Sequence, residues 1–67
     1  MTSSQLANVA QRIKDISQEL IDLSEEAKDE NIVFLSEILE KQSDIIFQSA
    51  NCIDDITNKM DLPRYQH

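Results

Sequence analysis

Apolar residues recur at alternating spacings of three and four over most of this chain, and the pattern breaks once, near residue 30. The first run consists of Leu6, Val9, Ile13, Ile16, Leu20, Leu23 and Ala27. The second run consists of Ile32, Leu35, Leu39, Ile46, Ile53, Ile56 and Met60, with polar Gln42 and Ser49 at two positions of the same spacing. Such spacing places side chains on one face of an α-helix, as at the a and d positions of a heptad. The sequence therefore predicts two long amphipathic helices.

The break between the two runs predicts a turn. Continuing the first frame would place Glu30 in the apolar row, whereas the second row starts at Ile32. Asn31 tolerates the left-handed conformation that often ends a helix, and either Asp29 or Asn31 could cap the next helix. The alternative is one continuous helix with a discontinuity at residues 28–31.

Both outer ends carry boundary signals. Thr2 and Gln5 have the spacing of a capping box, which predicts that the first helix starts at about Ser3. Pro63 cannot continue a helix, so the second helix should end near Met60. The predicted fold is all-α.

The predicted architecture is an antiparallel helical hairpin, with helices at about 3–28 and 31–61. It forms a single domain over residues 1–67, in which residues 1–2 are the N-terminal cap and residues 62–67 are a short tail. Folding at the turn is expected to set the two apolar rows against each other in register. Small side chains beside the first row would let another helix approach closely; they are Ala7, Ala10, Ser17 and Ser24.

A second copy of the chain is expected. A chain of 67 residues buries only about 60% of the surface that its unfolded form exposes. One cysteine cannot form an internal disulfide, and one cysteine with one histidine cannot complete a structural zinc site. The second helix also has more apolar surface than one partner helix can cover, and these surplus residues are Phe34, Ile38, Ile45, Phe47 and Cys52. The sequence predicts a homodimeric four-helix bundle in which these residues contact a partner.

Acidic residues align on the first helix and predict a second partner-binding surface. Asp15, Glu19, Asp22, Glu26 and Asp29 are spaced 4, 3, 4 and 3 apart, which places them along one edge. The chain has thirteen acidic and six basic residues, a net charge of −7. This charge disfavours direct binding of nucleic acid and favours a protein with a basic surface, whereas the surplus apolar residues favour a partner with an apolar surface.

No catalytic, cofactor-binding or metal-binding residues are expected. An acid–base pair needs a desolvated pocket, which a two-helix hairpin lacks. Cys52 on the apolar flank is interpreted as a small core residue, because His67 stands at the chain end and no triad can be assembled. No apolar run approaches the ~20 residues of a membrane span, so a cytoplasmic protein without a membrane partner is predicted.

In helix length and turn position, residues 3–60 resemble the Rop-type RNA-binding bundles of plasmid copy-number control. The resemblance implies a direct RNA-binding bundle, although the first helix differs by its acidic edge and has only Arg12, Lys14 and Lys28 as basic residues. The leading functional hypothesis is a small acidic non-enzymatic interaction module, a dimeric regulator, inhibitor or chaperone of another protein. An alternative is an inhibitor whose carboxylates imitate nucleic acid and occupy a DNA- or RNA-binding protein.

Overall fold

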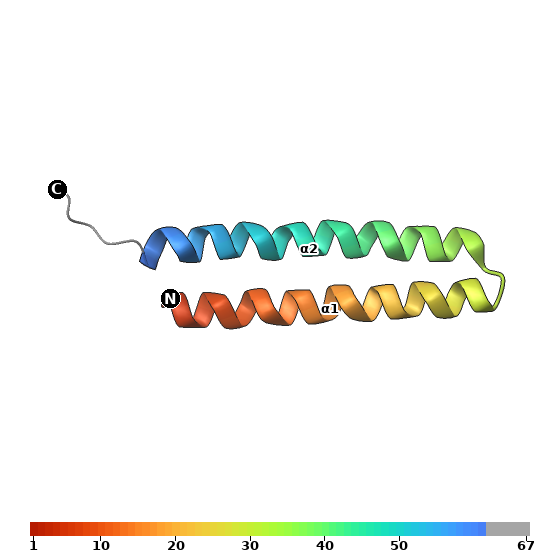
Figure 1. Cartoon of the computed structure of the whole chain (residues 1–67), viewed down its shortest axis with the longest axis horizontal. Helices are drawn as coiled ribbons and strands as arrows, with labels where there is room; N and C mark the ends of the chain where they lie inside the picture. The colour runs from red at the N-terminus through yellow and green to blue at the C-terminus, as the bar shows by residue number, and fades with distance from the viewer. Residues whose placement is uncertain (62–67) are drawn as a thin grey trace.

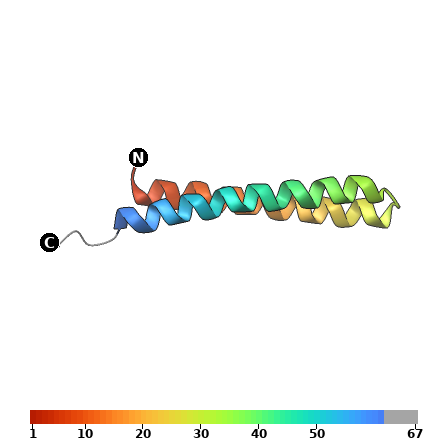
Figure 2. The ribbon, with the colours of Figure 1, turned by 90° about the horizontal axis from the view of Figure 1, so that it is seen from above.

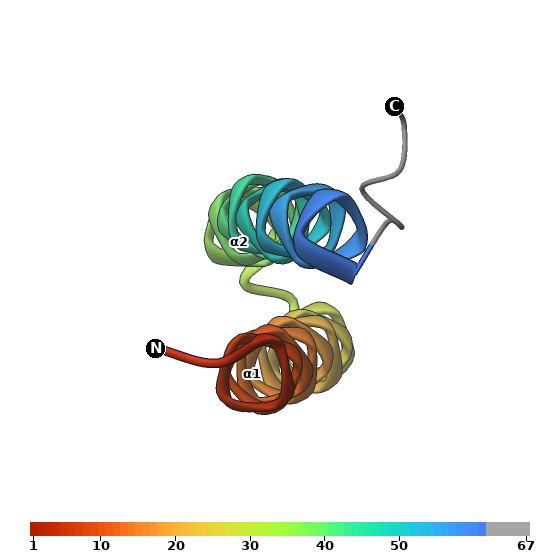
Figure 3. The same ribbon diagram turned by 90° about the vertical axis from the view of Figure 1, so that its left-hand side faces the viewer.

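The computed structural model describes residues 1–61, which form two α-helices and no strands. Helix α1 (Ser3–Asp29) and helix α2 (Val33–Asp61) lie side by side and antiparallel, joined at one end by a short turn (Figure 1). The two helices cross at a shallow angle and form a single layer (Figures 2 and 3). The prediction of an all-α antiparallel hairpin is confirmed. The tail predicted at residues 62–67 lies outside the described residues.

The start of α1 is fixed by the predicted capping box. The Thr2 hydroxyl Oγ1 accepts a hydrogen bond of 3.1 Å from the Gln5 backbone N–H. In return, the Thr2 backbone N–H donates to Gln5 Oε1 at 2.8 Å. Two backbone N–H groups, those of Thr2 and Gln5, thus find hydrogen-bond partners at a helix end where backbone donors would otherwise lack them.

The turn between the two helices is formed by a C-terminal capping motif of α1. Asn31 has a φ angle of 65°, and its backbone N–H donates to the Lys28 carbonyl at 3.0 Å. The N–H of Ile32 donates to the Ala27 carbonyl at 2.8 Å. These two bonds define a Schellman motif in which asparagine takes the position usually occupied by glycine. Because Asn31 and Ile32 complete the end of α1, α2 begins at Val33, two residues later than the sequence predicted.

Small side chains fill the line along which the two helices meet. They recur every seven residues and are buried, with at most 8% of their surface exposed. This contact line consists of Ala10, Ser17 and Ser24 from α1, and Ser36, Ser43, Ala50 and Thr57 from α2. Small residues permit closely spaced helix axes, so the large apolar side chains are placed beside the line rather than on it.

The two rows of large apolar residues lie side by side on one face of the hairpin, where Leu23, Leu35 and Leu39 line one groove, and the expectation that they form the line of contact itself is wrong. Ile16 and Leu23 belong to the first row, and each leaves 48% of its surface exposed. The small residues that were expected to admit another helix instead receive α2, with Ala7 as the exception because it is exposed. A rotation of both helices by part of a turn about their axes accounts for the difference, because the contact-line residues of each helix follow one place after members of its apolar row.

Serine hydroxyls connect the helices at the middle of the contact line. Ser17 Oγ donates to the Ser43 carbonyl at 2.9 Å, and Ser43 Oγ donates to the Ser17 carbonyl at 2.8 Å. The two hydroxyl oxygens are 2.7 Å apart. A side chain as short as serine reaches a neighbouring helix backbone only at close range. By contrast, Ser36 Oγ is buried without a hydrogen-bond partner among the described residues.

Candidate interaction surface

The contact line divides the hairpin surface into two faces of different chemistry. At about 100° per residue, side chains three and four places after a contact residue lie on opposite sides of the line. In an antiparallel pair, equivalent offsets in the two helices fall on the same side of the hairpin. Two grooves agree with this geometry, because Leu39 (Ser36 plus three) and Phe47 (Ser43 plus four) line different grooves.

The first side, called the closed face below, consists of residues four places after the contact residues. Its members are Lys14, Ile21 and Lys28 from α1, and Glu40, Phe47 and Asp54 from α2. Lys14 Nζ lies 2.7 Å from Asp54 Oδ2, and Lys28 Nζ lies 2.8 Å from Glu40 Oε1. The hydrogen bond to Glu40 and the charge of that carboxylate raise the pKa of Lys28 above its usual value of 10.5. Ile21 and Phe47 line one groove between the two ion pairs.

The opposite side, called the open face below, consists of residues three places after and one place before the contact residues. Its large apolar members are Val9, Ile13, Ile16, Leu20 and Leu23 from α1, and Leu35, Leu39, Ile46, Ile53, Ile56 and Met60 from α2. Gln42 and Ser49 belong to the same face and are exposed. Both interhelical ion pairs found within residues 1–61 lie on the closed face. The open face therefore leaves large apolar side chains uncovered, with Ile56 53% exposed.

The open face is hollowed near the turn. A groove of about 340 Å³ runs between the helices there. Its apolar lining is Leu23, Ala27, Ile32, Leu35 and Leu39. Glu26 and Glu30 also line it, so the groove combines an apolar floor with a negative margin.

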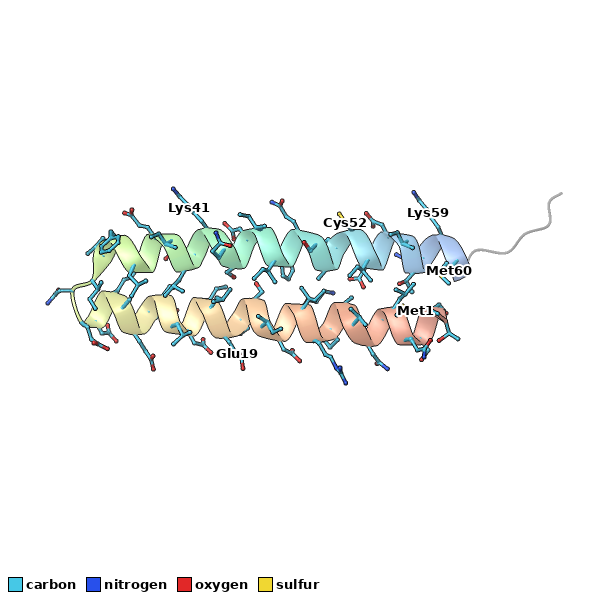
Figure 4. The ribbon with its side chains drawn as sticks, turned by 180° about the vertical axis from the view of Figure 1, so that it is seen from behind. Met1, Glu19, Lys41, Cys52, Lys59 and Met60 are labelled. Carbon is cyan, nitrogen blue, oxygen red and sulfur yellow. The ribbon has the colours of Figure 1, made fainter. Side chains whose placement is uncertain are left out.

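The outer rims of the open face differ between the two helices. Residues two places after the contact residues form these rims and are exposed. The rim of α2 is apolar at Ile38, Ile45 and Cys52 and ends in a charged residue, Lys59. The rim of α1 is charged and consists of Arg12, Glu19 and Glu26. Figure 4 shows the side chain of Cys52 extending away from α1 and that of Glu19 extending away from α2.

The acidic edge predicted on α1 lies on the side of that helix that faces away from α2. All five of its carboxylates are exposed: Asp15, Glu19, Asp22, Glu26 and Asp29. Neutral amides contact two of them, because Gln11 Nε2 donates to Asp15 Oδ1 and Gln18 Nε2 donates to Asp22 Oδ1, each at 3.1 Å. The edge is thus accessible, and it borders the open face through Glu19 and Glu26, of which Glu26 also lines the groove.

The apolar contact residues predicted on α2 do not form one patch. Ile38, Ile45 and Cys52 lie together on the rim of the open face, whereas Phe47 belongs to the closed face. Phe34 is 71% exposed, and it stands two places before Ser36, outside the open face. A partner that covers the open face would therefore leave the side chains of Phe34 and Phe47 uncovered.

Cys52 is exposed, so its interpretation as a core residue of the hairpin is wrong. The reason is its position two places after Ala50, which turns the thiol away from α1. Within the described residues, no group of three or more histidine, cysteine, aspartate or glutamate side chains could hold a metal ion. His67 lies outside those residues.

Sequence reasoning missed the contact line of α2. Its signal was present as Ser36, Ser43, Ala50 and Thr57, four small residues at strict seven-residue spacing. The large apolar row beside them was predicted to be the buried face instead, because hydrophobicity is the usual guide to burial.

The chain matches no protein-family model, and comparisons with curated proteins and with solved structures found no match. Neither helix in the described part of the chain combines the length and apolar character that crossing a membrane requires.

Proposed function

We propose that this chain is a non-enzymatic protein–protein interaction module that acts as a homodimeric helical bundle. The open face binds a second copy, and the acidic edge of α1 binds another protein with a basic surface, which the dimer regulates, inhibits or chaperones. The observation that carries the proposal is the asymmetry of the hairpin. One face is bridged by two ion pairs and exposes one large apolar residue, Phe47, whereas the other presents several exposed isoleucine and leucine side chains.

The energetic support for a second copy comes from the exposed fractions on the open face. Ile16, Leu23 and Ile56 each leave about half of their surface in water. Burying a large aliphatic side chain completely contributes about 1.5–3 kcal/mol, so covering each half-exposed residue contributes about 1 kcal/mol. Contiguous apolar patches of this kind mark interaction surfaces in small proteins.

The support for a basic protein partner comes from the distribution of charge. Residues 19–45 carry nine carboxylates against two lysines, a net charge of −7, equal to that of the whole chain. Their negative field surrounds the turn half of the hairpin, and the acidic edge of α1 contributes to it. Such a field accelerates encounter with basic partners and weakens as salt is added. The exposed thiol of Cys52 fits a reducing compartment, so a cytoplasmic location is part of the proposal.

Dimer formation is tested by sedimentation equilibrium at micromolar concentration. We expect the mass of two 7.7 kDa chains. A folded species with the mass of one chain would contradict the dimeric part of the proposal.

Partner binding is tested by affinity capture from a native lysate, with proteins identified by mass spectrometry. We expect a stoichiometric basic protein that elutes as salt is raised. The variant Asp15→Asn/Asp22→Asn/Asp29→Asn should lose it, because all three carboxylates belong to the acidic edge and none to the open face. The matched control is Glu37→Gln/Asp44→Asn/Asp55→Asn on α2, which removes the same charge and should retain the partner. Equal retention by both variants would contradict a role for the edge.

The alignment of the carboxylates supports a second candidate function, an inhibitor that imitates nucleic acid. The five side chains extend over about 21 Å of helix at 1.5 Å per residue, and all are exposed. The captured partner would then bind DNA or RNA, and the hairpin should displace that ligand in a competition assay. Simultaneous binding of hairpin and nucleic acid by the partner would exclude this candidate. A gel shift of RNA by the isolated hairpin at physiological salt would instead favour the Rop-like, direct RNA-binding alternative.

A further inference from the structure

We propose that the second copy packs on the open face with its turn at the opposite end, related by a two-fold axis that runs across the hairpin. In this arrangement α1 packs against the partner's α1, and α2 packs against the partner's α2. The inference rests on the proposed function, which requires a second copy but leaves its orientation open. Two hairpins can be stacked face to face by one other two-fold axis, which runs along the hairpin and places both turns at the same end.

The rims of the open face distinguish the two arrangements. With both turns at one end, each α1 would lie on the partner's α2. The charged rim residues Glu19 and Glu26 would then lie beside the partner's Ile38 and the partner's Ile45. Burying carboxylates beside apolar groups without partners is unfavourable. With the turns at opposite ends, the apolar rim of α2 meets the apolar rim of the partner's α2, and the charged rims meet each other.

The charged rims are also complementary in this orientation. Ser17 and Ser43 lie side by side, so residues of α1 and α2 whose numbers sum to about 60 share a level along the hairpin. If the two hairpins overlap along their full length, the two-fold axis passes near residues 14–15 of α1. Arg12 is then within about one turn of the partner's Glu19, and the symmetry repeats the pair. Opposite charges at such flanking positions favour one orientation of paired helices.

The polar residues of the open face fit the same register. Full overlap pairs residues of α2 whose numbers sum to about 91, because the axis passes near residues 45–46. Gln42 therefore lies at the level of the partner's Ser49, and the two polar side chains can hydrogen-bond across the interface. On α1, Ile13 lies at the level of the partner's Ile16. A slide by seven residues in either direction would uncover about 10 Å at each end.

The net charge favours the same orientation. Residues 19–45 carry −7 and occupy the turn half of the hairpin. Turns at one end would bring both negative halves together. Turns at opposite ends separate the two halves along the bundle by more than the Debye length of about 8 Å at physiological salt.

The size of the open face is sufficient for a dimer. It is about 40 Å long, from 26 or so residues of helix, and about 18 Å wide, which is two helix widths. The resulting area is about 700 Å² per copy, close to the roughly 800 Å² per partner of a standard stable interface.

The arrangement has a consequence for the acidic edges. Because the two α1 helices are neighbours, both edges lie on the same side of the bundle and form one extended negative surface. The surface presented to a basic partner is then twice that of a single hairpin. The opposite side of the bundle presents the two α2 helices and the Phe34 side chains.

Spin-label distance measurements test the orientation. Cys52→Ser removes the native thiol, and Glu30→Cys places one nitroxide at the exposed turn of each chain. We expect a separation of about 45 Å, from about 31 residues of rise, whereas turns at the same end would give about 15 Å. A label at Asp15→Cys, near the axis, is the control that reports dimer formation in either orientation by a separation under about 30 Å. A short Glu30→Cys distance would overturn the inference.

Disulfide trapping tests the register in the same Cys52→Ser background. Chains carrying Gln42→Cys are mixed with tagged chains carrying Ser49→Cys and are then oxidised. We expect the mixed disulfide dimer to dominate on a non-reducing gel, and neither variant alone to cross-link efficiently. Efficient cross-linking of Gln42→Cys with itself would overturn the register.

Failure of the inference is distinguishable from failure of the proposed function. A short turn-to-turn distance together with undiminished capture of the basic partner would refute the orientation and leave the function standing. A long turn-to-turn distance without any captured partner would support the orientation and contradict the function.

Discussion

The open and closed faces of the hairpin flank the same line of backbone contact, but only the closed face is bridged by ion pairs, and it exposes one large apolar side chain, Phe47, where the open face exposes several. On the closed face, Lys14 and Lys28 extend from α1 to Asp54 and Glu40 of α2. On the open face, large apolar side chains take the place of these ion pairs, and the hairpin buries them only in part. The difference teaches that two helices suffice to hold the contact line but not to bury the apolar surface that the sequence encodes.

The largest predicted effect compares two isoleucines with the same burial in the hairpin. Ile13 on the open face and Ile21 on the closed face are both partly buried. If a second copy covers the open face, Ile13→Ala should destabilise by about 2–4 kcal/mol and Ile21→Ala by about 1 kcal/mol. Thermal unfolding at several protein concentrations measures both, and the Tm of each protein should rise with concentration. Equal losses without a concentration dependence would show that the open face stays uncovered.

The next effect concerns the serines that separate the two faces. Ser43→Ala should cost about 1–2 kcal/mol, because its hydroxyl exchanges short hydrogen bonds with Ser17. Ser36→Ala should be neutral or stabilising, because the buried Ser36 hydroxyl has no partner among the described residues. Chemical denaturation of both variants checks the contrast. A larger loss at Ser36 than at Ser43 would mean that the helices pair differently along this line.

A smaller effect tests the polar positions of the open face. Gln42→Leu should raise the Tm by a few degrees, because a leucine there is covered by the second copy, and should broaden the distribution of assemblies. Native mass spectrometry and thermal unfolding provide the two measurements. A single dimeric species with an unchanged Tm would show that Gln42 is at the solvent-exposed margin and does not specify the assembly.

The smallest effect concerns an ion pair of the closed face. Lys28→Met should change stability only slightly, because the Lys28–Glu40 pair is exposed to solvent and screened by it. The folded state raises the pKa of Lys28, so its contribution is present below the usual value of 10.5 and is lost as pH rises through the folded-state pKa. Denaturation of wild type and variant between pH 8 and about 12 should converge at the alkaline end. Lys41→Met, which removes an exposed lysine of α2, serves as the control.

Much of the secondary structure followed from the sequence because local signals decide it. The capping box at Thr2 and Gln5 fixed the start of α1, and the phase slip before Ile32 located the turn. The left-handed conformation at Asn31 was also anticipated, since few residues other than glycine adopt it readily. The start of α2 was missed by two residues because the capping motif of α1 extends to Ile32, which depends on backbone hydrogen bonds rather than on hydrophobic pattern.

The candidate surface followed from the sequence only in part. The acidic edge lies where the spacing placed it, because five carboxylates at 4-3-4-3 intervals share one side of any straight helix. Phe34 and Phe47 were grouped with Ile38 and Ile45, although they project from other sides of α2. The grouping used hydrophobicity alone, whereas the angular position relative to the contact line separates these residues.

By itself, the sequence determined that there are two helices, where the first begins and the turn lies, and which residues share a side of each helix. Only the tertiary structure decided which side faces the other helix. A heptad pattern fixes angles within one helix and leaves free the rotation of that helix about its axis. That rotation is set by the closest approach of two backbones, which serine hydroxyls bonded to the opposite helix favour at Ser17 and Ser43. The small residues therefore occupy the contact line, and the large apolar residues whose spacing predicted the helices lie beside it.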